Sequence, residues 1–317
     1  MRIAVTGGAG FIGGHLIERL GEMEAGEIVA LDNFHRPCSG AQHALFESVK
    51  FLRTDVRDRS GLAEAMRGCS VVFHLAAQSN VMGAVYDADY AFSSNVTGTF
   101  NVLRAAASAG VKRVVFTSSR EVYGDPKRLP VRETSPLRPK NGYGASKAAG
   151  EVYCRSAAHE GLETVILRLA NVYGTRDHDR VIPLFARAAT AGSPLTIYGG
   201  DQVVDFVWID TVVDALMKSA FGPWIRGPVN VGSGKGVTVS ELARRIVQLT
   251  GSASAIHNAG PREQEVSRFV ADITHAKKVL GIVSPKDPLG RLPQVLSWFD
   301  KPTAHVATLG NGFKQAV

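Results

Sequence analysis

Cysteine is scarce in this sequence: its 317 residues include only Cys38, Cys69 and Cys154, which are widely separated. This spacing argues against a disulfide framework and against a Cys-x-x-Cys metal site, so we expect a reducing compartment, the cytoplasm. Apolar runs are short, and none is long enough to cross a bilayer. A glycine-rich stretch begins after a few residues, and we therefore expect no signal peptide.

Clusters of basic residues are missing as well. The formal net charge is +7, yet Lys and Arg are interspersed with acids, and no basic run or basic–aromatic pattern occurs. A phosphate-bearing small molecule is therefore the expected partner, and nucleic acid is not. His178 lies between Asp177 and Asp179 in a polar loop, but no second cluster accompanies it, so no metal is predicted.

What the first half of the chain does contain is a repeated alternation of short β-rich runs with helix-like segments. Each run is apolar nearly throughout, as is typical of strands buried on both faces of a parallel sheet. The pattern predicts an α/β fold, a Rossmann doubly wound parallel sheet with a smaller C-terminal substrate-binding lobe. We expect a Rossmann domain over 1–174, to which 203–222 returns a strand and a helix, a lobe over 175–300, and a tail over 301–317. The expected strands of the first domain are 2–7, 27–32, 49–55, 71–77, 111–119 and 163–174.

The stretch "VTGGAGFIGG" places Gly7, Gly10 and Gly13 between a predicted strand and a predicted helix. In such a unit these glycines permit a tight turn, a close approach to a pyrophosphate and close helix–strand packing, while the helix N-terminus attracts the phosphate charge. Asp32 ends the next strand, where a carboxylate accepts hydrogen bonds from ribose hydroxyls and repels a 2′-phosphate, so the pattern predicts NAD. Arg36 lies near enough to meet a 2′-phosphate, which leaves NADP as an alternative.

Tyr143 and Lys147 lie one helical turn apart in "YGASK". An ammonium beside a phenol favours the phenolate, so that Tyr143 can act as a general base near neutral pH. A YxxxK pair by itself is common on helix surfaces. Here it follows a dinucleotide-binding pattern and a strand that ends in Ser118 and Ser119, and together these indicate a catalytic centre of Tyr143, Lys147 and Ser119.

Several segments in order resemble one family. They are "TGGAGFIGG", "FHLAA", "SSREVYG", "YGASKAAGE", "RLANVYG" and "VADITHAKKVLG". The chain resembles the extended short-chain dehydrogenase/reductases of the NAD-dependent epimerase/dehydratase family, and among them the nucleotide-sugar 4-epimerases, over residues 1–300. The resemblance implies that NAD is bound tightly and recycled within each turnover.

The resemblance also implies roles for individual residues. Lys147 would hold the nicotinamide ribose, Ser119 would hydrogen-bond the sugar hydroxyl at C4, and Tyr143 would take the O4 proton as hydride leaves C4. The implied cofactor contacts are Gly7, Gly10, Phe11 and Ile12 for the pyrophosphate, Asp32 and Asn33 for the adenosine ribose, Asp55 and Val56 for the adenine, and Leu75, Ala76, Ala77 and Thr117 for the nicotinamide side.

In the lobe, the family's substrate positions meet the diphosphate and the nucleotide base. Two positions depart from the family pattern. The arginine of the usual "GxxxRDF" is Val204 here, and Arg180 stands where the epimerases carry an uncharged amide. Arg180 either takes over the phosphate contact or is a solvated loop arginine. The implied substrate contacts are Asn171, Arg180, Val181, Thr196, Tyr198 and Arg262.

A third departure is in "SSREVYG". Glu121 stands where sugar 4,6-dehydratases and uronate decarboxylases carry a glutamate, and such a carboxylate can remove the C5 proton once C4 is a ketone. Dehydratases add an aspartic acid where this chain has Arg120, and an arginine stays charged, so it cannot protonate a leaving hydroxyl. Two orientations of Arg120 remain open: toward a C6 carboxylate, which would make the substrate a nucleotide uronate, or outward to an acid.

The expected function is that of an NAD-dependent nucleotide-sugar 4-epimerase acting on a UDP-sugar, with UDP-glucuronate among the candidates. One alternative is a dehydratase or uronate decarboxylase that uses Glu121 at C5. Another is a non-catalytic nucleotide-binding protein on the same fold. The Ala-rich helices around 97–109 and 144–158 are either a four-helix dimer seam or plain coverings of the sheet, and we expect a homodimer.

Overall fold

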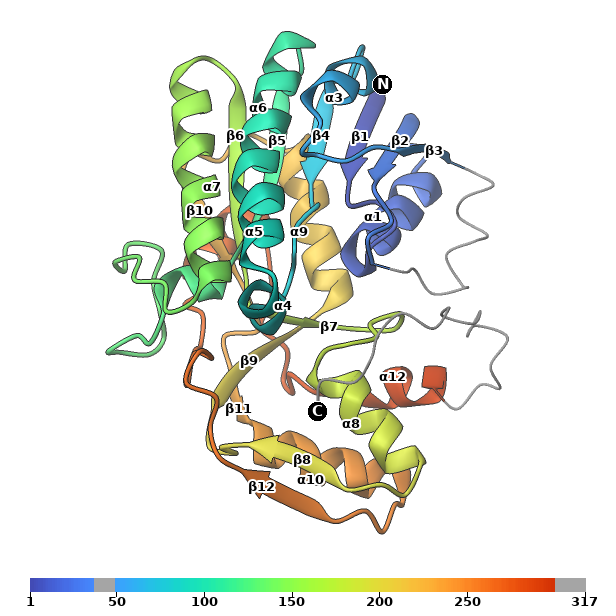
Figure 1. Ribbon diagram of the computed structural model, residues 1–317, viewed down its shortest axis with the longest axis vertical. Coiled ribbons are helices and arrows are strands. Elements are labelled where there is room, and N and C mark those ends of the chain that lie inside the picture. Colours follow the sequence, from blue (N-terminus) through green and yellow to red (C-terminus); the bar gives the residue numbers. More distant parts are fainter. Residues whose placement is uncertain (37–48, 300–317) are drawn as a thin grey trace.

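The structure is a computed structural model that describes residues 1–36 and 49–299 (Figure 1). These residues form a seven-stranded sheet in the order β10-β6-β5-β4-β1-β2-β3, and each neighbouring pair is parallel. Strand order reverses between β1 and β4, which confirms the predicted doubly wound Rossmann fold. The strands are β1 (Arg2–Thr6), β2 (Glu27–Asp32), β3 (Lys50–Arg53), β4 (Val71–His74), β5 (Arg113–Ser119), β6 (Glu163–Leu169) and β10 (Pro228–Val231).

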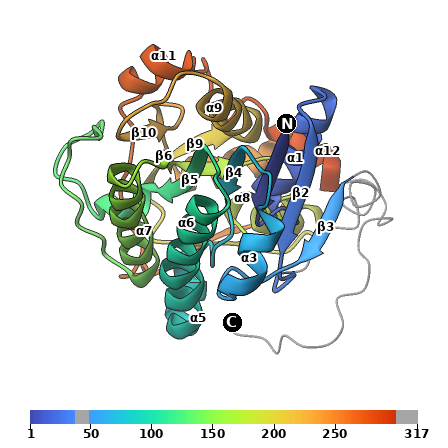
Figure 2. The ribbon, with the colours of Figure 1, turned by 90° about the horizontal axis from the view of Figure 1, so that it is seen from above.

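Helices cover both faces of this sheet, as the view from above shows (Figure 2). Side chains alternate along each strand, so Ile3 and Val5 of β1 join one buried cluster and Ala4 joins the other. The first cluster packs under α1 (Phe11–Glu22), α9 (Ile209–Phe221) and α11 (Thr274–Leu280), and the second under α3 (Arg59–Ala65), α6 (Gly98–Ser108) and α7 (Gly142–His159). Shorter turns at the carboxyl edge are α4 (Val81–Tyr86), α5 (Ala88–Phe92), the π-helical η2 (Ser93–Thr97) and the 3₁₀-helical η3 (Arg120–Tyr123).

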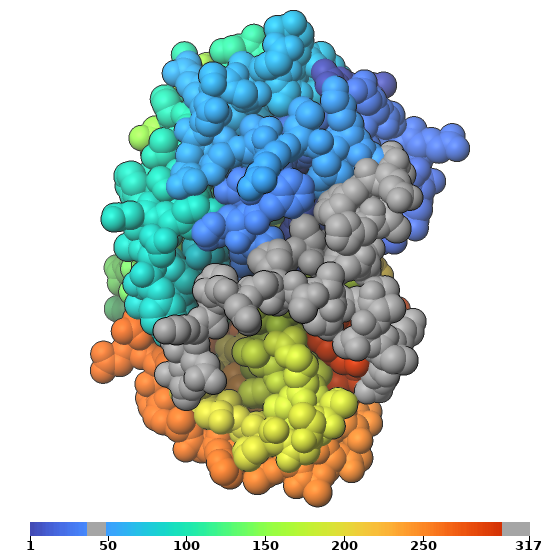
Figure 3. Space-filling view, turned by 45° about the vertical axis from the view of Figure 1, so that its right-hand side comes forward, coloured from blue at the N-terminus to red at the C-terminus, as the bar shows by residue number. Residues whose placement is uncertain are grey.

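A smaller lobe lies beyond the carboxyl edge of the main sheet, at the lower end of Figures 1 and 3. Its own core joins Phe185, Phe206, Leu242 and Leu292 from four different elements. The lobe contains a three-stranded sheet of β7 (Asn171–Tyr173), β9 (Val203–Trp208) and β11 (Gly236–Thr238), a pair of β8 (Leu195–Tyr198) and β12 (Ile256–Ala259), and the helices α8 (Val181–Thr190), α10 (Val239–Thr250) and α12 (Leu292–Phe299).

Two expectations about strands are wrong. The run 163–174 is not one strand, because the chain leaves the main sheet at Ala170 and continues as β7 in the lobe; Ala170 N–H donates to the carbonyl oxygen of Val231 at 2.9 Å. The segment 203–222 returns only its helix, α9, to the main sheet, since β9 pairs with β7 and β11. The seventh strand is instead β10, which pairs with β6 and which the sequence pattern did not reveal.

The predicted tail, 301–317, and Cys38 lie outside the described residues. Cys69 and Cys154 are buried free thiols. Within the described part of the chain, every helix falls short of the length and apolar character that a membrane crossing requires.

Candidate active site

The glycine-rich turn lies between β1 and α1, at the carboxyl edge where the strand order reverses. Gly7 has a φ of +72°, and a Cβ added there would lie 2.7 Å from the nitrogen of Ala76. A Cβ on Gly13 would lie 2.2 Å from the carbonyl oxygen of Gly7, so neither position accommodates a side chain. The N-cap residue of α1 is Gly10, which has no side chain of its own to occupy the start of the helix. Close backbone approach and an anion-attracting helix N-terminus are what a pyrophosphate requires.

Asp32, at the end of β2, ties this turn to the neighbouring strand. Its carboxylate accepts hydrogen bonds from the N–H groups of Ala9, at 3.0 Å, and Phe34, at 2.8 Å. Burial raises the pKa of Asp32 above its ordinary value, and these backbone donors oppose the shift. The side-chain amide of Asn33, the next residue, donates to Asp55 at 2.9 Å. This hydrogen bond joins a residue assigned to the ribose with one assigned to the adenine.

Arg36 extends from the same edge toward the smaller lobe. Its Nη1 donates to Ser79 Oγ at 2.6 Å, and its Nη2 forms an ion pair with Asp179, just before α8. From the sequence, Arg36 was left open as a ligand for a 2′-phosphate. In the structure its guanidinium is bound by Ser79 and Asp179 at the boundary between the sheet and the lobe.

A cleft of about 450 Å³ runs from the carboxyl ends of β4 and β5 into the lobe. It gathers all of the catalytic and substrate residues predicted from the sequence, together with one end of the cofactor set. The predicted residues that line it are Ile12, Leu75, Ala77, Thr117, Ser119, Arg120, Glu121, Tyr143, Lys147, Asn171, Arg180, Val181, Thr196, Tyr198 and Arg262. The predicted cofactor residues outside its lining are Gly7, Gly10, Phe11, Asp32, Asn33, Asp55, Val56 and Ala76.

Tyr143, Lys147 and Ser119 come together at the wall of this cleft. Tyr143 lies in the first turn of α7, and its hydroxyl hydrogen-bonds Ser119 at the end of β5. Lys147, one turn further along, donates from Nζ to the carbonyl oxygen of Thr117 at 2.9 Å. Asn141 caps α7 by accepting from the Gly144 N–H at 2.8 Å, which fixes the turn that carries Tyr143.

Burial dominates the electrostatics of this group. It raises the pKa of Tyr143, while the hydrogen bond from Ser119 and the charges of Arg180 and Arg120 oppose the rise. Burial also lowers the pKa of Lys147 to about 8. We expected the ammonium of Lys147 to lower the pKa of the Tyr143 phenol. The pKa of Tyr143 is raised instead, because the cost of burying a phenolate is larger than the effect of the neighbouring charges.

Arg120 points into the protein rather than outward, and it pairs with its neighbour in sequence. Its Nη2 lies 2.9 Å from Glu121 Oε1, and the other carboxylate oxygen accepts from Asn141 Nδ2 at 2.7 Å. Both side chains are largely buried, with 12% of Arg120 and 5% of Glu121 exposed. Arg120 Nη1 is buried and has no hydrogen-bond partner among residues 1–36 and 49–299. We did not identify Asn141 from the sequence, although its position shortly before "YGASK" could have indicated it.

On the lobe side, two arginines line the cleft. Arg180 precedes α8, pairs with Asp177 at 3.0 Å and lies 5.3 Å from the ring centroid of Phe11. Arg262 stacks on Tyr198, with its guanidinium carbon 3.7 Å from the ring centroid. Asn171, in β7, has a buried side-chain oxygen that finds no partner among the residues the structure describes. Val204, where the family pattern has arginine, is buried in the wall of the cleft.

A charged network behind α7 was missed from the sequence. Glu151, one turn beyond Lys147, is fully buried and accepts from Arg168 Nε at 2.8 Å, from Arg168 Nη2 at 2.7 Å and from Ser118 Oγ at 2.6 Å. Arg168 also donates to the hydroxyl of Tyr123 at 2.7 Å. The network therefore links α7, β6, η3 and the end of β5, and charged residues inside otherwise apolar runs were its signal in the sequence.

Asn95, in the π-helical turn η2, is a second buried residue that the sequence did not single out. Its side chain accepts from the Gln78 N–H at 2.8 Å and donates to Ser146 Oγ at 2.9 Å. It thereby joins the loop after Ala77 to the residue beside Lys147.

As for metals, the described residues contain no group of three or more His, Cys, Asp or Glu side chains placed to hold an ion.

Comparisons with known proteins agree with this geometry. Residues 3–221 match the model of the NAD dependent epimerase/dehydratase family. The chain is 36% identical over 293 residues to the UDP-glucose 4-epimerase of Mycolicibacterium smegmatis, covering 89% of this chain and 93% of that protein. It is 33% identical over 320 residues to the UDP-N-acetyl-alpha-D-glucosaminuronate decarboxylase of Bacillus cytotoxicus, covering 94% and 97%. The structure of Thermus thermophilus UDP-glucose 4-epimerase in complex with NAD superposes with a TM-score of 0.87 at 33% identity, covering 95% of this chain and 99% of that one.

Proposed function

We propose that this chain, which belongs to the NAD-dependent epimerase/dehydratase family, is a UDP-sugar 4-epimerase that oxidises C4 and reduces it again on the other face. The observation that carries the proposal is the difference between two groups in the cleft. The Tyr143–Ser119 pair opens to the cleft, whereas both oxygens of Glu121, the candidate base for C5 chemistry, are bound by Arg120 and Asn141.

NAD is the cofactor, as in the family and in the matched structure. The residues present fit it: the glycine turn has no room for a Cβ at Gly7, and Asp32 ends β2 at the place where a ribose would lie. Bound in its oxidised form, NAD supplies the hydride acceptor for C4, the hydride source for the return step, and a positive charge that favours the phenolate of Tyr143.

The chain's own residues hold and move the proton at O4. Ser119 hydrogen-bonds the C4 hydroxyl and directs it at Tyr143, whose hydroxyl oxygen accepts the O4 proton as C4 becomes a ketone. The phenol returns the proton when C4 is reduced. Lys147, anchored on the carbonyl oxygen of Thr117, holds the nicotinamide ribose and places its charge on the same side of α7.

The lobe binds the nucleotide diphosphate. Arg180 and the N-terminus of α8, which no described side chain caps, present positive charge to the cleft from one side. Tyr198 offers a face for the base, and Arg262 can fork onto a phosphate. Arg180 supplies the phosphate contact that Val204 cannot make.

The alternative is a lyase that uses Glu121 at C5, and the identity to a uronate decarboxylase is the observation in its favour. Incubating the purified protein with UDP-glucose, UDP-N-acetylglucosamine and UDP-glucuronate separates the two. We expect a product of unchanged mass with the C4 configuration inverted, resolved by chromatography and mass spectrometry. A product that has lost water or carbon dioxide would assign the lyase, and no product from any UDP-sugar would leave a non-catalytic binding protein.

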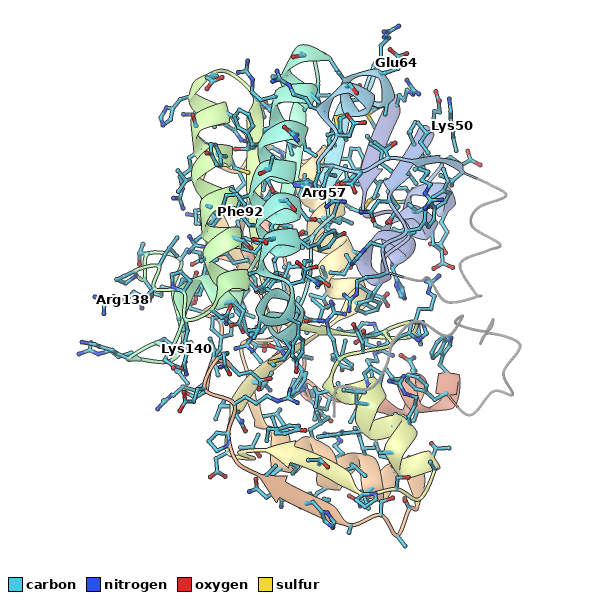
Figure 4. The ribbon with its side chains drawn as sticks, in the orientation of Figure 1. Lys50, Arg57, Glu64, Phe92, Arg138 and Lys140 are labelled. Atoms are coloured by element: carbon cyan, nitrogen blue, oxygen red, sulfur yellow. The ribbon has the colours of Figure 1, made fainter. Side chains whose placement is uncertain are left out.

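A second copy of the chain is the partner we propose for the outer face of α6 and α7. Phe100 and Tyr153 contact each other there, with ring centroids 5.4 Å apart, and are 38% and 40% exposed. Phe92, labelled in Figure 4, and Val152 are also exposed. An aromatic patch shared by two helices suits an isologous four-helix seam.

Replacing Phe100 and Tyr153 together with Glu should convert the dimer to a monomer, because four carboxylates would meet across the two-fold seam. Size-exclusion chromatography with light scattering measures the change. The control is Val283→Glu, which adds a charge at an apolar residue that is 80% exposed elsewhere and should leave the dimer intact. A wild-type protein that is monomeric at micromolar concentration would contradict the proposed seam.

A further inference from the structure

Arg120 has one terminal nitrogen that no group in the described part of the chain satisfies. We propose that Arg120 binds a carboxylate at C6 of the sugar, so that the cleft selects nucleotide uronates over neutral nucleotide sugars. This inference rests on the proposed 4-epimerase function and names the substrate class of the same site.

The guanidinium is held in place before any ligand arrives. Its Nη2 pairs with Glu121, and Glu121 is fixed by Asn141, whose amide also donates to the carbonyl oxygen of Gln264 at 3.0 Å. The guanidinium carbon lies 6.0 Å from the ring centroid of Phe269, which is fully buried. Glu121 therefore acts as an anchor for Arg120, and the arginine loses little conformational freedom when it binds a ligand.

The remaining donor requires an acceptor. Arg120 Nη1 is buried and has no partner among the described residues, although Arg120 lines the cleft. Buried donors in proteins are almost always satisfied, and a charged donor prefers an anionic acceptor over a hydroxyl. The pair with Glu121 satisfies only one end of the guanidinium, whose planar fork can bind a second carboxylate.

The position of Arg120 relative to the reacting hydroxyl points to C6. It directly follows Ser119, which hydrogen-bonds Tyr143, and Tyr143 faces O4 in the proposed reaction. In a pyranose, C6 is attached to C5, the neighbour of C4, whereas the diphosphate is attached to C1 across the ring. Arg180 and Arg262 lie on the lobe side of the cleft and serve the diphosphate, so Arg120 is left for an anionic group near C4.

The same contact protects the substrate. Once C4 is a ketone, a C6 carboxylate is β to it, and breaking the C5–C6 bond would release carbon dioxide while the electron pair moves into the ketone as an enolate. A guanidinium stabilises the negative charge on the carboxylate, which disappears as carbon dioxide forms, and therefore opposes that loss.

Steady-state kinetics with UDP-glucuronate and UDP-glucose test the inference. Wild-type protein should have the higher kcat/KM for UDP-glucuronate. Arg120→Met should lower that value by about 10- to 100-fold, the usual cost of losing a hydrogen bond to a charged group, and should change the value for UDP-glucose far less. The control is Arg138→Met, which removes an exposed loop arginine (Figure 4) and should alter neither.

A second variant covers the case in which Arg120→Met leaves Glu121 unpaired and does not fold. Arg120→Lys keeps a charge for Glu121 but cannot present two nitrogens, so it should lose part of the preference for the uronate. Equal kcat/KM for both sugars in the wild type, or equal losses on both in a folded variant, would overturn the inference while leaving the 4-epimerase intact. Formation of a pentose from UDP-glucuronate by the wild type would instead overturn the proposed function.

Discussion

Replacing Tyr143 with Phe should lower kcat by roughly 100-fold or more, because it removes the group that exchanges the O4 proton. The ring, its burial and its packing remain, so the fold and the bound NAD should be unchanged. Ser119 remains beside O4 but is a poor base without a partner to take its proton. The residual rate should also lose the pH dependence that the buried phenol gives the wild type.

Initial rates on the preferred UDP-sugar, with NAD content measured after denaturation, test this prediction. Tyr153→Phe is the matched control, since it removes one hydroxyl from the same helix on a face away from the cleft and keeps the ring that the proposed dimer seam uses, and it should have near-normal rates. If Tyr143→Phe also turned over at a near-normal rate, the proton would be handled by another group and the assigned role would be wrong.

Replacing Glu151 with Ala should destabilise the protein by about 3–5 kcal/mol, the range found when one member of a buried ion pair is removed. Arg168 is 2% exposed and would keep a buried charge without its carboxylate, and Ser118 would lose its acceptor. The network holds α7 against β5, so the angle at which Tyr143 and Lys147 meet Ser119 depends on it.

Urea unfolding of the NAD-bound protein measures this loss. Arg155→Ala is the control, because Arg155 bonds the same carboxylate at 3.0 Å but is 44% exposed, and its removal should cost at most about 1 kcal/mol. If the Glu151→Ala protein were as stable as the Arg155→Ala protein, solvent or a shift of the chain would be compensating the buried charge of Arg168. The network would then not set the position of α7.

The main fold could be predicted from the sequence because parallel strands buried on both faces leave continuous apolar runs. Residues 27–32 were expected to form a strand and do so without change of bounds. The break at Ala170 could not be predicted, since "RLANVY" has no glycine or proline at the point where the chain passes from one sheet to another. β10 has only four residues and pairs with β6 at the far edge, a contact that periodicity does not encode.

The candidate site also divides into features that the sequence could predict and features that it could not. The glycine turn and the Tyr143–Lys147 pair depend on local spacing, and the structure brings Tyr143 and Lys147 to Ser119 in one cleft. The pairing of Arg120 with Glu121 depends on side-chain direction after β5, and the pairing of Glu151 with Arg168 on the packing of α7 against β6. The raised pKa of Tyr143 also needed the three-dimensional structure, because burial outweighs the neighbouring charges.

The central claim, that C4 is oxidised and reduced without chemistry at C5, is tested most directly by running the reaction in D₂O with UDP-glucuronate and UDP-glucose. Proton NMR of the products reports the fate of each carbon-bound hydrogen. We predict inverted configuration at C4, an intact C6, and no deuterium at C4 or C5, since the hydrogen that leaves C4 as hydride returns to it. Deuterium at C5, with or without loss of carbon dioxide or water, would contradict the 4-epimerase and assign Glu121 the role of a base.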